Sequence, residues 1–406
     1  MKRASDLAIL GGPPAFAEPL HVGRPNIGDR DRLFALFADM LDRRWLTNRG
    51  PYVEELERRI ASMLGVRHCV AMCNATVGLE IAVRAAGLGG EVIVPSFTFV
   101  ATAHALQWQG ITPVFCDIDP RTHNIDPRRI EELITPRTTG IVGVHVWGRG
   151  CDTAAIDEIA ARRGLTVLYD AAHAFACTHD GRPIGSFGTA EVLSFHATKF
   201  INAFEGGAVV TDDDALASRL RLMKNFGFAD YDEVVSIGIN GKMSEASAAM
   251  GLTSLESIDT FLDINRRSYA AYAHHFEGMP GIELLRYDET ERGNYQYVVL
   301  EVDADAFGLS RDELHAVLQA ERVLARRYFH PGCHRMEPYR SLYPDAGRRL
   351  PETERLTARV LSLPTGTAVD AAAIEEVCAI IHLARAQAAA IRERLARPPG
   401  APAAAP

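Results

Sequence analysis

Features that mark several classes of protein are missing from this sequence. It has no run of basic residues, and 43 basic against 52 acidic side chains give a net charge of −9. This charge argues against binding to nucleic acid or to an anionic membrane surface. No stretch approaches the ~18 uninterrupted apolar residues of a membrane span. The basic start at Lys2 and Arg3 is soon followed by Asp6 and a Gly-Gly-Pro-Pro segment, so the apolar region is too short for an export signal.

The cysteine and glycine patterns argue against a disulfide-bonded exported protein and against a nicotinamide dehydrogenase. Seven cysteines are scattered and odd in number, with no Cys-x-x-Cys pair, a pattern typical of reduced thiols inside a cell. We therefore expect a cytoplasmic protein. No Gly-x-Gly-x-x-Gly segment follows a predicted strand, which argues against a nicotinamide dehydrogenase.

Lysine is the scarcest of the charged residues. It occurs only four times among the 43 basic residues, at Lys2, Lys199, Lys224 and Lys242. Codon bias toward arginine explains this ratio, but arginine cannot replace lysine where chemistry needs a neutral, nucleophilic amine. A lysine inside an ordered motif is therefore a candidate for catalysis.

Apolar segments along the first two thirds of the chain predict a buried sheet. They are apolar throughout rather than alternating, which suits strands of a mostly parallel sheet with helices on both faces. Helices are predicted over residues 32–41 and 52–64. The strands are expected at residues 91–94, 113–118, 141–146, 166–170, 191–195 and 208–211.

The pattern changes after residue 250. We expect helices at 252–273 and 370–395 and strands at 295–302 and 326–329. The predicted organisation is an N-terminal segment (1–20), a large α/β domain with a mixed, mostly parallel sheet (21–250), a smaller α+β domain (251–396) and a disordered tail (397–406).

The segment around Lys199 carries the strongest chemical signal. A predicted strand ends at Ser194, and Lys199 follows five positions later in a turn. A lysine that forms a Schiff base needs a site at a strand end, a partly desolvated pocket and nearby phosphate donors. The alternative is an ordinary surface lysine. With the Ser194 hydroxyl as a donor, the pair indicates pyridoxal phosphate (PLP).

Three upstream segments supply the other parts of such a site. Asp170 ends a predicted strand and could keep the cofactor's pyridine nitrogen protonated, although a helix cap is an equal alternative. His173 alone is more typical of a packed or surface histidine. Residues 73–76 precede a predicted helix at 77–86, and the N–H groups and the Thr76 hydroxyl at its N-terminus could bind phosphate, with a plain Asn/Thr cap as the alternative. Phe97 and Phe99 offer aromatic faces but by default belong to the core.

The order of these motifs makes the chain recognisable. It resembles, over about residues 20–390, the sugar aminotransferase family that bears the DegT/DnrJ/EryC1/StrS name, which are PLP-dependent enzymes of fold type I. The matching segments are Gly50-Pro51-Tyr52-Val53-Glu54, Asn74-Ala75-Thr76, Pro95-Ser96-Phe97-Thr98-Phe99, Asp170-Ala171-Ala172-His173-Ala174, Ser194-Phe195-His196-Ala197-Thr198-Lys199, Glu205-Gly206-Gly207 and Asn240-Gly241-Lys242-Met243-Ser244-Glu245.

The resemblance implies a role for each of these positions. Lys199 is expected to carry the cofactor and to shuttle the proton. Asp170 is expected to pair with the pyridinium nitrogen, and His173 to contact the ring 3′-oxygen. Phe99 would stack on the ring, with Phe97 at an outward position of the same strand end. The phosphate contacts implied are Ala75, Thr76, Ser194 and, from the neighbouring subunit of a homodimer, Asn240.

Two other clusters are less specific. Residues 330–334 contain histidines and a cysteine, but adjacent ligands in a Pro-Gly turn suit a metal poorly, so we expect no metal site. The family comparison instead places this loop near the sugar, with His334 the expected contact. Residues 43–49, including Thr47 and Asn48, could approach the nucleotide because guanidinium groups suit pyrophosphate, or could form a solvated loop.

The resemblance also implies a reaction. The expected activity transfers an amino group, with L-glutamate as donor, to dTDP-4-keto-6-deoxy-D-glucose, and so forms dTDP-4-amino-4,6-dideoxy-D-glucose for a secondary metabolite such as an antibiotic. A more deoxygenated 4-keto sugar, a 3-keto sugar and a non-catalytic, PLP-bound regulatory protein remain alternatives. A sugar 3-dehydratase of the same fold has histidine in place of the lysine, so Lys199 argues against that activity.

Overall fold

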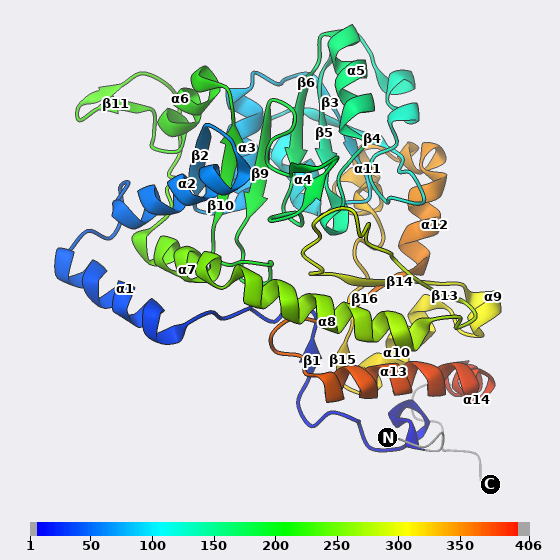
Figure 1. Ribbon diagram of the computed structural model, residues 1–406. Coiled ribbons are helices and arrows are strands. Elements are labelled where there is room, and N and C mark those ends of the chain that lie inside the picture. Colours follow the sequence, from blue (N-terminus) through cyan, green and yellow to red (C-terminus); the bar gives the residue numbers. More distant parts are fainter. Residues whose placement is uncertain (1–5, 397–406) are drawn as a thin grey trace.

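A seven-stranded sheet forms the centre of the larger domain in the computed structural model, which describes residues 6–396 (Figure 1). The strand order is β2-β10-β9-β6-β5-β3-β4. Only β10 runs antiparallel to its neighbours, which confirms the predicted mixed, mostly parallel sheet. The strands are β2 (His68–Met72), β3 (Glu91–Pro95), β4 (Thr112–Cys116), β5 (Thr138–Val144), β6 (Thr166–Asp170), β9 (Ala190–Ser194) and β10 (Gly207–Thr211).

Helices cover both faces of this sheet. Every residue of β3, β9 and β10 is buried, because apolar side chains leave both faces of these strands toward helices. One face packs against α2 (Pro51–Leu64), α5 (Thr153–Arg163) and α7 (Glu245–Glu256). The other packs against α3 (Ala75–Ala85), α4 (Val100–Gln107) and α6 (Asp214–Met223). Helix α1 (Arg30–Arg43) lies against α7.

The C-terminal part of the chain forms a second sheet and core. We call this part the small domain, and the part around the seven-stranded sheet the large domain. Strands β13 (Ile282–Leu284), β14 (Val298–Val302) and β16 (Val360–Leu363) are antiparallel, and β1 (Leu20–His21) pairs in parallel with β15 (Val323–Leu324). Leu7 and Leu20 belong to this core, so the N-terminal segment packs on the C-terminal part of the chain. The helices here are α8 (Ile258–Phe276), α9 (Ala304–Phe307), α10 (Arg311–Ala320), α12 (Pro351–Arg359), α13 (Ala371–Ala386) and α14 (Ala388–Ala396). Helix α11 (Tyr339–Leu342) instead packs on the large sheet, where Tyr339 contacts Phe115 of β4.

Two short hairpins complete the fold. Strands β7 (Thr178–His179) and β8 (Arg182–Pro183) form one, and β11 (Phe228–Asp230) and β12 (Glu233–Val234) form the other. The second hairpin projects from the large domain, away from the small one (Figure 1). We call residues 226–239 the arm.

Some predicted elements differ from those observed. The single helix predicted over 252–273 is wrong, because α7 and α8 meet at Ser257, whose hydroxyl donates back to the Thr253 carbonyl over 3.0 Å. The predicted helix 370–395 likewise divides at Gln387. The strand at 326–329 is also wrong: Arg326 makes an isolated bridge to Ser362, and the chain then turns. The tail predicted to be disordered lies outside the described residues, among which no helix is both long and apolar enough to cross a bilayer.

A buried carboxylate connects two of the sequence motifs, residues 50–54 and 240–245. Glu245 is fully buried and accepts hydrogen bonds from the backbone N–H groups of Tyr52 (2.9 Å) and Val53 (2.8 Å) at the start of α2. Its own N–H donates to the Leu46 carbonyl at 3.0 Å. Gly50 lies so close that a Cβ atom there would stand 2.4 Å from the Glu245 carboxyl carbon. Glu245 therefore caps α2 and holds the loop before it.

We predict that Glu245→Ala lowers the free energy of unfolding by about 2–4 kcal/mol, because two buried N–H groups lose their acceptor. Glu245→Gln, which keeps one acceptor oxygen, should lose less. Urea denaturation measures the difference. The control is Glu55→Ala on the same helix, where the half-exposed carboxylate pairs with the exposed Arg58 and a change within about 0.5 kcal/mol is expected. Equal losses for Glu245→Ala and Glu55→Ala would contradict the capping role.

Candidate active site

The carboxyl ends of the parallel strands bring the predicted site residues to one edge of the sheet. Asp170, at the end of β6, is in register with Val144 of β5 and Val192 of β9. Ser194, at the end of β9, lies opposite Gly207, which in turn lies opposite Met72 at the end of β2. In an open α/β sheet this edge is where ligands bind.

The Asp170 carboxylate is buried and held at both oxygens. The Thr102 hydroxyl donates to Oδ2 over 2.8 Å, and the Ala172 N–H donates to Oδ1 over 3.1 Å. Burial raises the pKa of Asp170, while these two hydrogen bonds and the charge of Lys199 oppose the rise. The side chain is thus fixed in position with acceptor capacity left for a cationic partner.

The Lys199 amine is desolvated beside this carboxylate. Burial lowers the pKa of Lys199 to about 8, and the negative charge of Asp170 partly opposes the shift. The backbone of Lys199 is fixed in a turn, where its N–H donates to the His196 carbonyl at 2.9 Å. Such a lysine is a nucleophile near neutral pH, unlike an exposed lysine.

His173 follows Asp170 and lies among aromatic rings. Its ring lies 4.3 Å from that of Tyr297 and stacks on Phe329 and Trp147 at 5.7 Å each, measured between ring centroids. Burial lowers its pKa well below the ordinary value, and the charge of Lys199 adds to this effect. His173 is therefore neutral at physiological pH.

The N-terminus of α3 forms an anion site at the same edge. Asn74 caps the helix by accepting from the Val77 N–H at 2.8 Å, which leaves the first N–H groups, on Ala75 and Thr76, for a ligand. A Cβ atom on Gly207 would stand 2.7 Å from the Ala75 nitrogen. Glycine at this position therefore keeps the amide accessible, and Ser194 lies opposite it in register.

The two phenylalanines have different environments. Phe99, directly before α4, is 57% exposed, so its ring is available to a ligand. Phe97 is fully buried and packs edge-on against Phe329 at 5.3 Å. The expected outward position of Phe97 is therefore wrong, and this residue belongs to the core.

These groups fit the expected cofactor. PLP presents an aldehyde, a basic ring nitrogen, a ring oxygen and a phosphate. The site offers a neutral amine at Lys199, a fixed carboxylate at Asp170, a neutral imidazole at His173 and a helix N-terminus at Ala75 and Thr76.

The other candidate contacts lie in varied settings. His334 is buried: Nδ1 lies 2.6 Å from the Ser96 hydroxyl and Nε2 lies 2.8 Å from Glu354, so its polar atoms are engaged within the chain. Thr47 and Asn48 are exposed between α1 and α2, and Asn240 is exposed at the base of the arm. Among residues 6–396 no three histidine, cysteine or acidic side chains gather in a way that could hold a metal.

Sequence reasoning missed three residues of this site. Thr102 could have been suspected, because it is a hydroxyl residue in the first turn of the helix after Phe99. Gly207 was noted only as part of a motif, and its close approach to Ala75 depends on strand pairing. Trp147 contacts His173 from a different loop, and no local sequence pattern connects the two.

Comparisons with known proteins agree with this geometry. Residues 29–382 match the DegT/DnrJ/EryC1/StrS aminotransferase family. A dTDP-4-amino-4,6-dideoxy-D-glucose transaminase from Shigella dysenteriae is 38% identical over 367 residues, which cover 90% of this chain and 99% of that protein. Its Escherichia coli counterpart is 37% identical over 349 residues, which cover 85% of this chain and 93% of that protein.

Solved structures give the same result. The crystal structure of DesI in the presence of its TDP-sugar product has a TM-score of 0.89 and 52% identity, and the match covers 97% of this chain and 99% of that one. The crystal structure of S. venezuelae DesV matches with a TM-score of 0.81 and 31% identity over 88% of this chain and 95% of that one. The expected α/β fold of type I is thereby confirmed. The chain belongs to the DegT/DnrJ/EryC1/StrS aminotransferase family and is a PLP-dependent enzyme.

Proposed function

We propose that this enzyme transfers an amino group from L-glutamate to C4 of dTDP-4-keto-6-deoxy-D-glucose and so forms dTDP-4-amino-4,6-dideoxy-D-glucose. The observation that carries the proposal is the desolvated Lys199 amine beside the fixed Asp170 carboxylate, since these two groups suit amino transfer. The choice of sugar is supported by the printed functions of the two bacterial transaminases and by the 52% identity to DesI.

Lys199 has the properties of a proton carrier. With a pKa of about 8, roughly a quarter of the amines are neutral at pH 7.5, against about one in a thousand for an unperturbed lysine. Both protonation states are thus accessible, so the same amine can accept a proton from one carbon and return it to another. An arginine could not do this, because its guanidinium stays charged.

Asp170 and its neighbours would hold the cofactor. Bound PLP supplies an electron sink and carries the amino group between two half-reactions. The Asp170 carboxylate, fixed by Thr102 and Ala172, would keep a proton on the ring nitrogen. We further propose the other contacts to the cofactor as Ala75, Thr76 and Ser194 at the phosphate, Phe99 at the ring face and His173 at the ring oxygen.

A basic cavity next to Phe99 suits a nucleotide-linked sugar. It has a volume of about 440 Å³, and Arg326, Arg327 and Tyr328 of the small domain line it together with Phe99. The Arg326 guanidinium lies 5.4 Å from the centroid of the Tyr328 ring. A guanidinium group can donate two parallel hydrogen bonds to phosphate oxygens. The lining of this cavity therefore supports a nucleoside diphosphate sugar as the substrate.

A homodimer with shared active sites is part of the same proposal. The arm carries seven exposed apolar side chains, a concentration that marks a contact surface in a monomer. Asn240, at the base of the arm, would then reach the phosphate of the partner. The seven residues are Phe226, Phe228, Tyr231, Val234, Val235, Ile237 and Ile239. A cytoplasmic location is proposed as well, because all seven cysteines are free and a reducing compartment preserves free thiols.

The reaction itself can be tested directly. The holoenzyme incubated with L-glutamate and dTDP-4-keto-6-deoxy-D-glucose should yield an amino sugar detectable by mass spectrometry, and Lys199→Ala should yield none. A panel with dTDP-3-keto and more deoxygenated 4-keto sugars measures the preference. Turnover confined to a 3-keto sugar would refute the C4 assignment, and no amino sugar from any member would favour a regulatory protein.

The pH dependence of cofactor attachment tests the environment of Lys199. Visible absorbance measures the rate at which PLP attaches to cofactor-free protein. This rate should rise with pH through a midpoint near 8, because only the neutral amine reacts. Asp170→Asn should move this midpoint to lower pH, since it removes the negative charge that favours the ammonium form. A midpoint near 10.5 in the wild type, or none of this shift in the variant, would contradict the assignment.

The arm can be tested through the mass of the particle. Replacing Tyr231 (91% exposed) and Ile237 (72% exposed) together by aspartate should convert a dimer to a monomer, because two charges would be buried without partners. Light scattering after gel filtration measures the mass. Trp108→Asp, at a residue 84% exposed on α4's C-terminal side, is the control; a double variant that keeps the mass of two chains would exclude the arm as the interface.

A further inference from the structure

Trp147 has an unusual position for a core tryptophan. It is fully buried, yet its backbone adopts φ +61° and ψ 13°, a left-handed conformation that costs free energy in a bulky residue. Its ring lies 5.4 Å from Phe329 at an angle of 13° and 5.7 Å from His173 at 27°. A conformation of this kind persists only where the surrounding structure requires it.

Both N–H groups of Trp147 donate hydrogen bonds to histidine rings. The backbone N–H donates to Nδ1 of His173 over 3.3 Å, and the indole N–H donates to Nδ1 of His123 over 3.1 Å. A ring nitrogen that accepts a hydrogen bond carries no proton, so this acceptor geometry places the ring proton on Nε2 in both histidines. One residue therefore sets the tautomer of both rings.

His123 continues this connection into the small domain. Its Nε2 lies 3.0 Å from Oε1 of Glu301 on β14, and Oε2 of Glu301 accepts from Arg355 at 3.2 Å. His123 is buried and has φ +63°, so it too is held in a left-handed conformation. For His173, in contrast, no internal partner of Nε2 is found between residues 6 and 396, which leaves this atom for a ligand.

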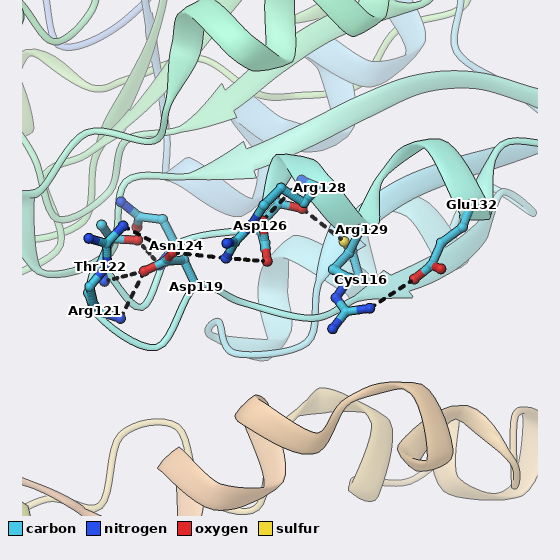
Figure 2. A network of polar contacts seen from close by, with 9 residues as sticks. All are labelled: Cys116, Asp119, Arg121, Thr122, Asn124, Asp126, Arg128, Arg129 and Glu132. Carbon is cyan, nitrogen blue, oxygen red and sulfur yellow. Dashed lines mark hydrogen bonds and ion pairs between the residues drawn. The ribbon is translucent and has the colours of Figure 1, made fainter.

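The loop after β4 clamps the backbone around Trp147. Asn124, next to His123, accepts from the Val146 N–H at 2.9 Å and donates to the carbonyls of Arg149 and Gly150 at 3.1 and 2.7 Å. Figure 2 shows that Asn124 belongs to a wider polar network in this loop. There Asp119 accepts from the N–H groups of Arg121 and Thr122, and Arg128 pairs with both Asp119 and Asp126. The loop is thus rigid on both sides of His123.

We propose that Trp147, braced by His123 and Glu301, is a positioning residue that holds His173 as the Nε2–H tautomer, so that His173 donates a hydrogen bond to the ring oxygen of the cofactor. The inference rests on the proposed contact between His173 and that oxygen. A donor there favours the ionised oxygen and thereby sets the pH at which the visible band of the lysine-bound cofactor titrates. Lys199, Asp170 and Tyr297 are the other titratable groups near His173.

The test changes Trp147 or Glu301, the residues proposed to hold His173, and leaves His173 itself in place. Trp147→Phe deletes the indole donor but keeps an aromatic ring, and Glu301→Leu deletes the acceptor of His123. In either holoenzyme the midpoint of the visible-band titration should rise by about half a pH unit or more, kcat should fall roughly tenfold, and the KM for the keto sugar should stay within about twofold. Glu301→Gln, which keeps an acceptor oxygen, should restore most of the wild-type behaviour.

A double-mutant cycle distinguishes positioning from packing. Glutamine at position 173 carries an N–H donor that depends on no tautomer, so in His173→Gln the change Trp147→Phe should shift the midpoint much less than in the wild type. Trp108→Phe, at an exposed tryptophan, is the matched control. The inference is overturned if Trp147→Phe and Glu301→Leu titrate like the wild type, or if Trp147→Phe shifts the midpoint equally in both backgrounds. Failure of the wild type to bind PLP would instead count against the proposed function.

Discussion

The chemistry of the site depends on holding a partly buried amine near a buried carboxylate at the end of a parallel sheet. Without Asp170, desolvation alone would act on Lys199, and without Lys199 the burial of Asp170 would be less well compensated. The pairing works only because Thr102 and the Ala172 N–H fix the carboxylate. Strand β6 ends at the buried Asp170, and the turn after β9 places the partly buried Lys199 near it.

The other parts of the site follow from the same sheet edge. The antiparallel strand β10 places Gly207 between the ends of β2 and β9, and the missing side chain keeps the first turn of α3 open. The aromatic rings around His173 belong to both domains, with Trp147 from the large one and Tyr297 and Phe329 from the small one. Small-domain packing thus contributes directly to the geometry of the site, through the rings and through Glu301.

The sequence predicted the central sheet and the chemical groups of the site better than the ends of the helices and the residues that hold the site in place. Continuous apolar segments marked six strands of the central sheet, but β2 was missed because it begins with His68 and has only one branched residue, Val70. Asp170 could be found because it ends a predicted strand, and Lys199 because it lies in the turn after one. The turn after Arg326 and the burial of His334 depend on contacts between distant segments, which no local pattern records.

The scarcity of lysine makes the central claim open to a decisive measurement. The holoenzyme is reduced with borohydride, digested, and mapped by mass spectrometry, which must distinguish only Lys2, Lys199, Lys224 and Lys242. The account predicts a stable pyridoxyl group on Lys199 alone, formed in proportion to the loss of the visible band. A label on another lysine instead, or the loss of the band without any label on Lys199, would contradict it.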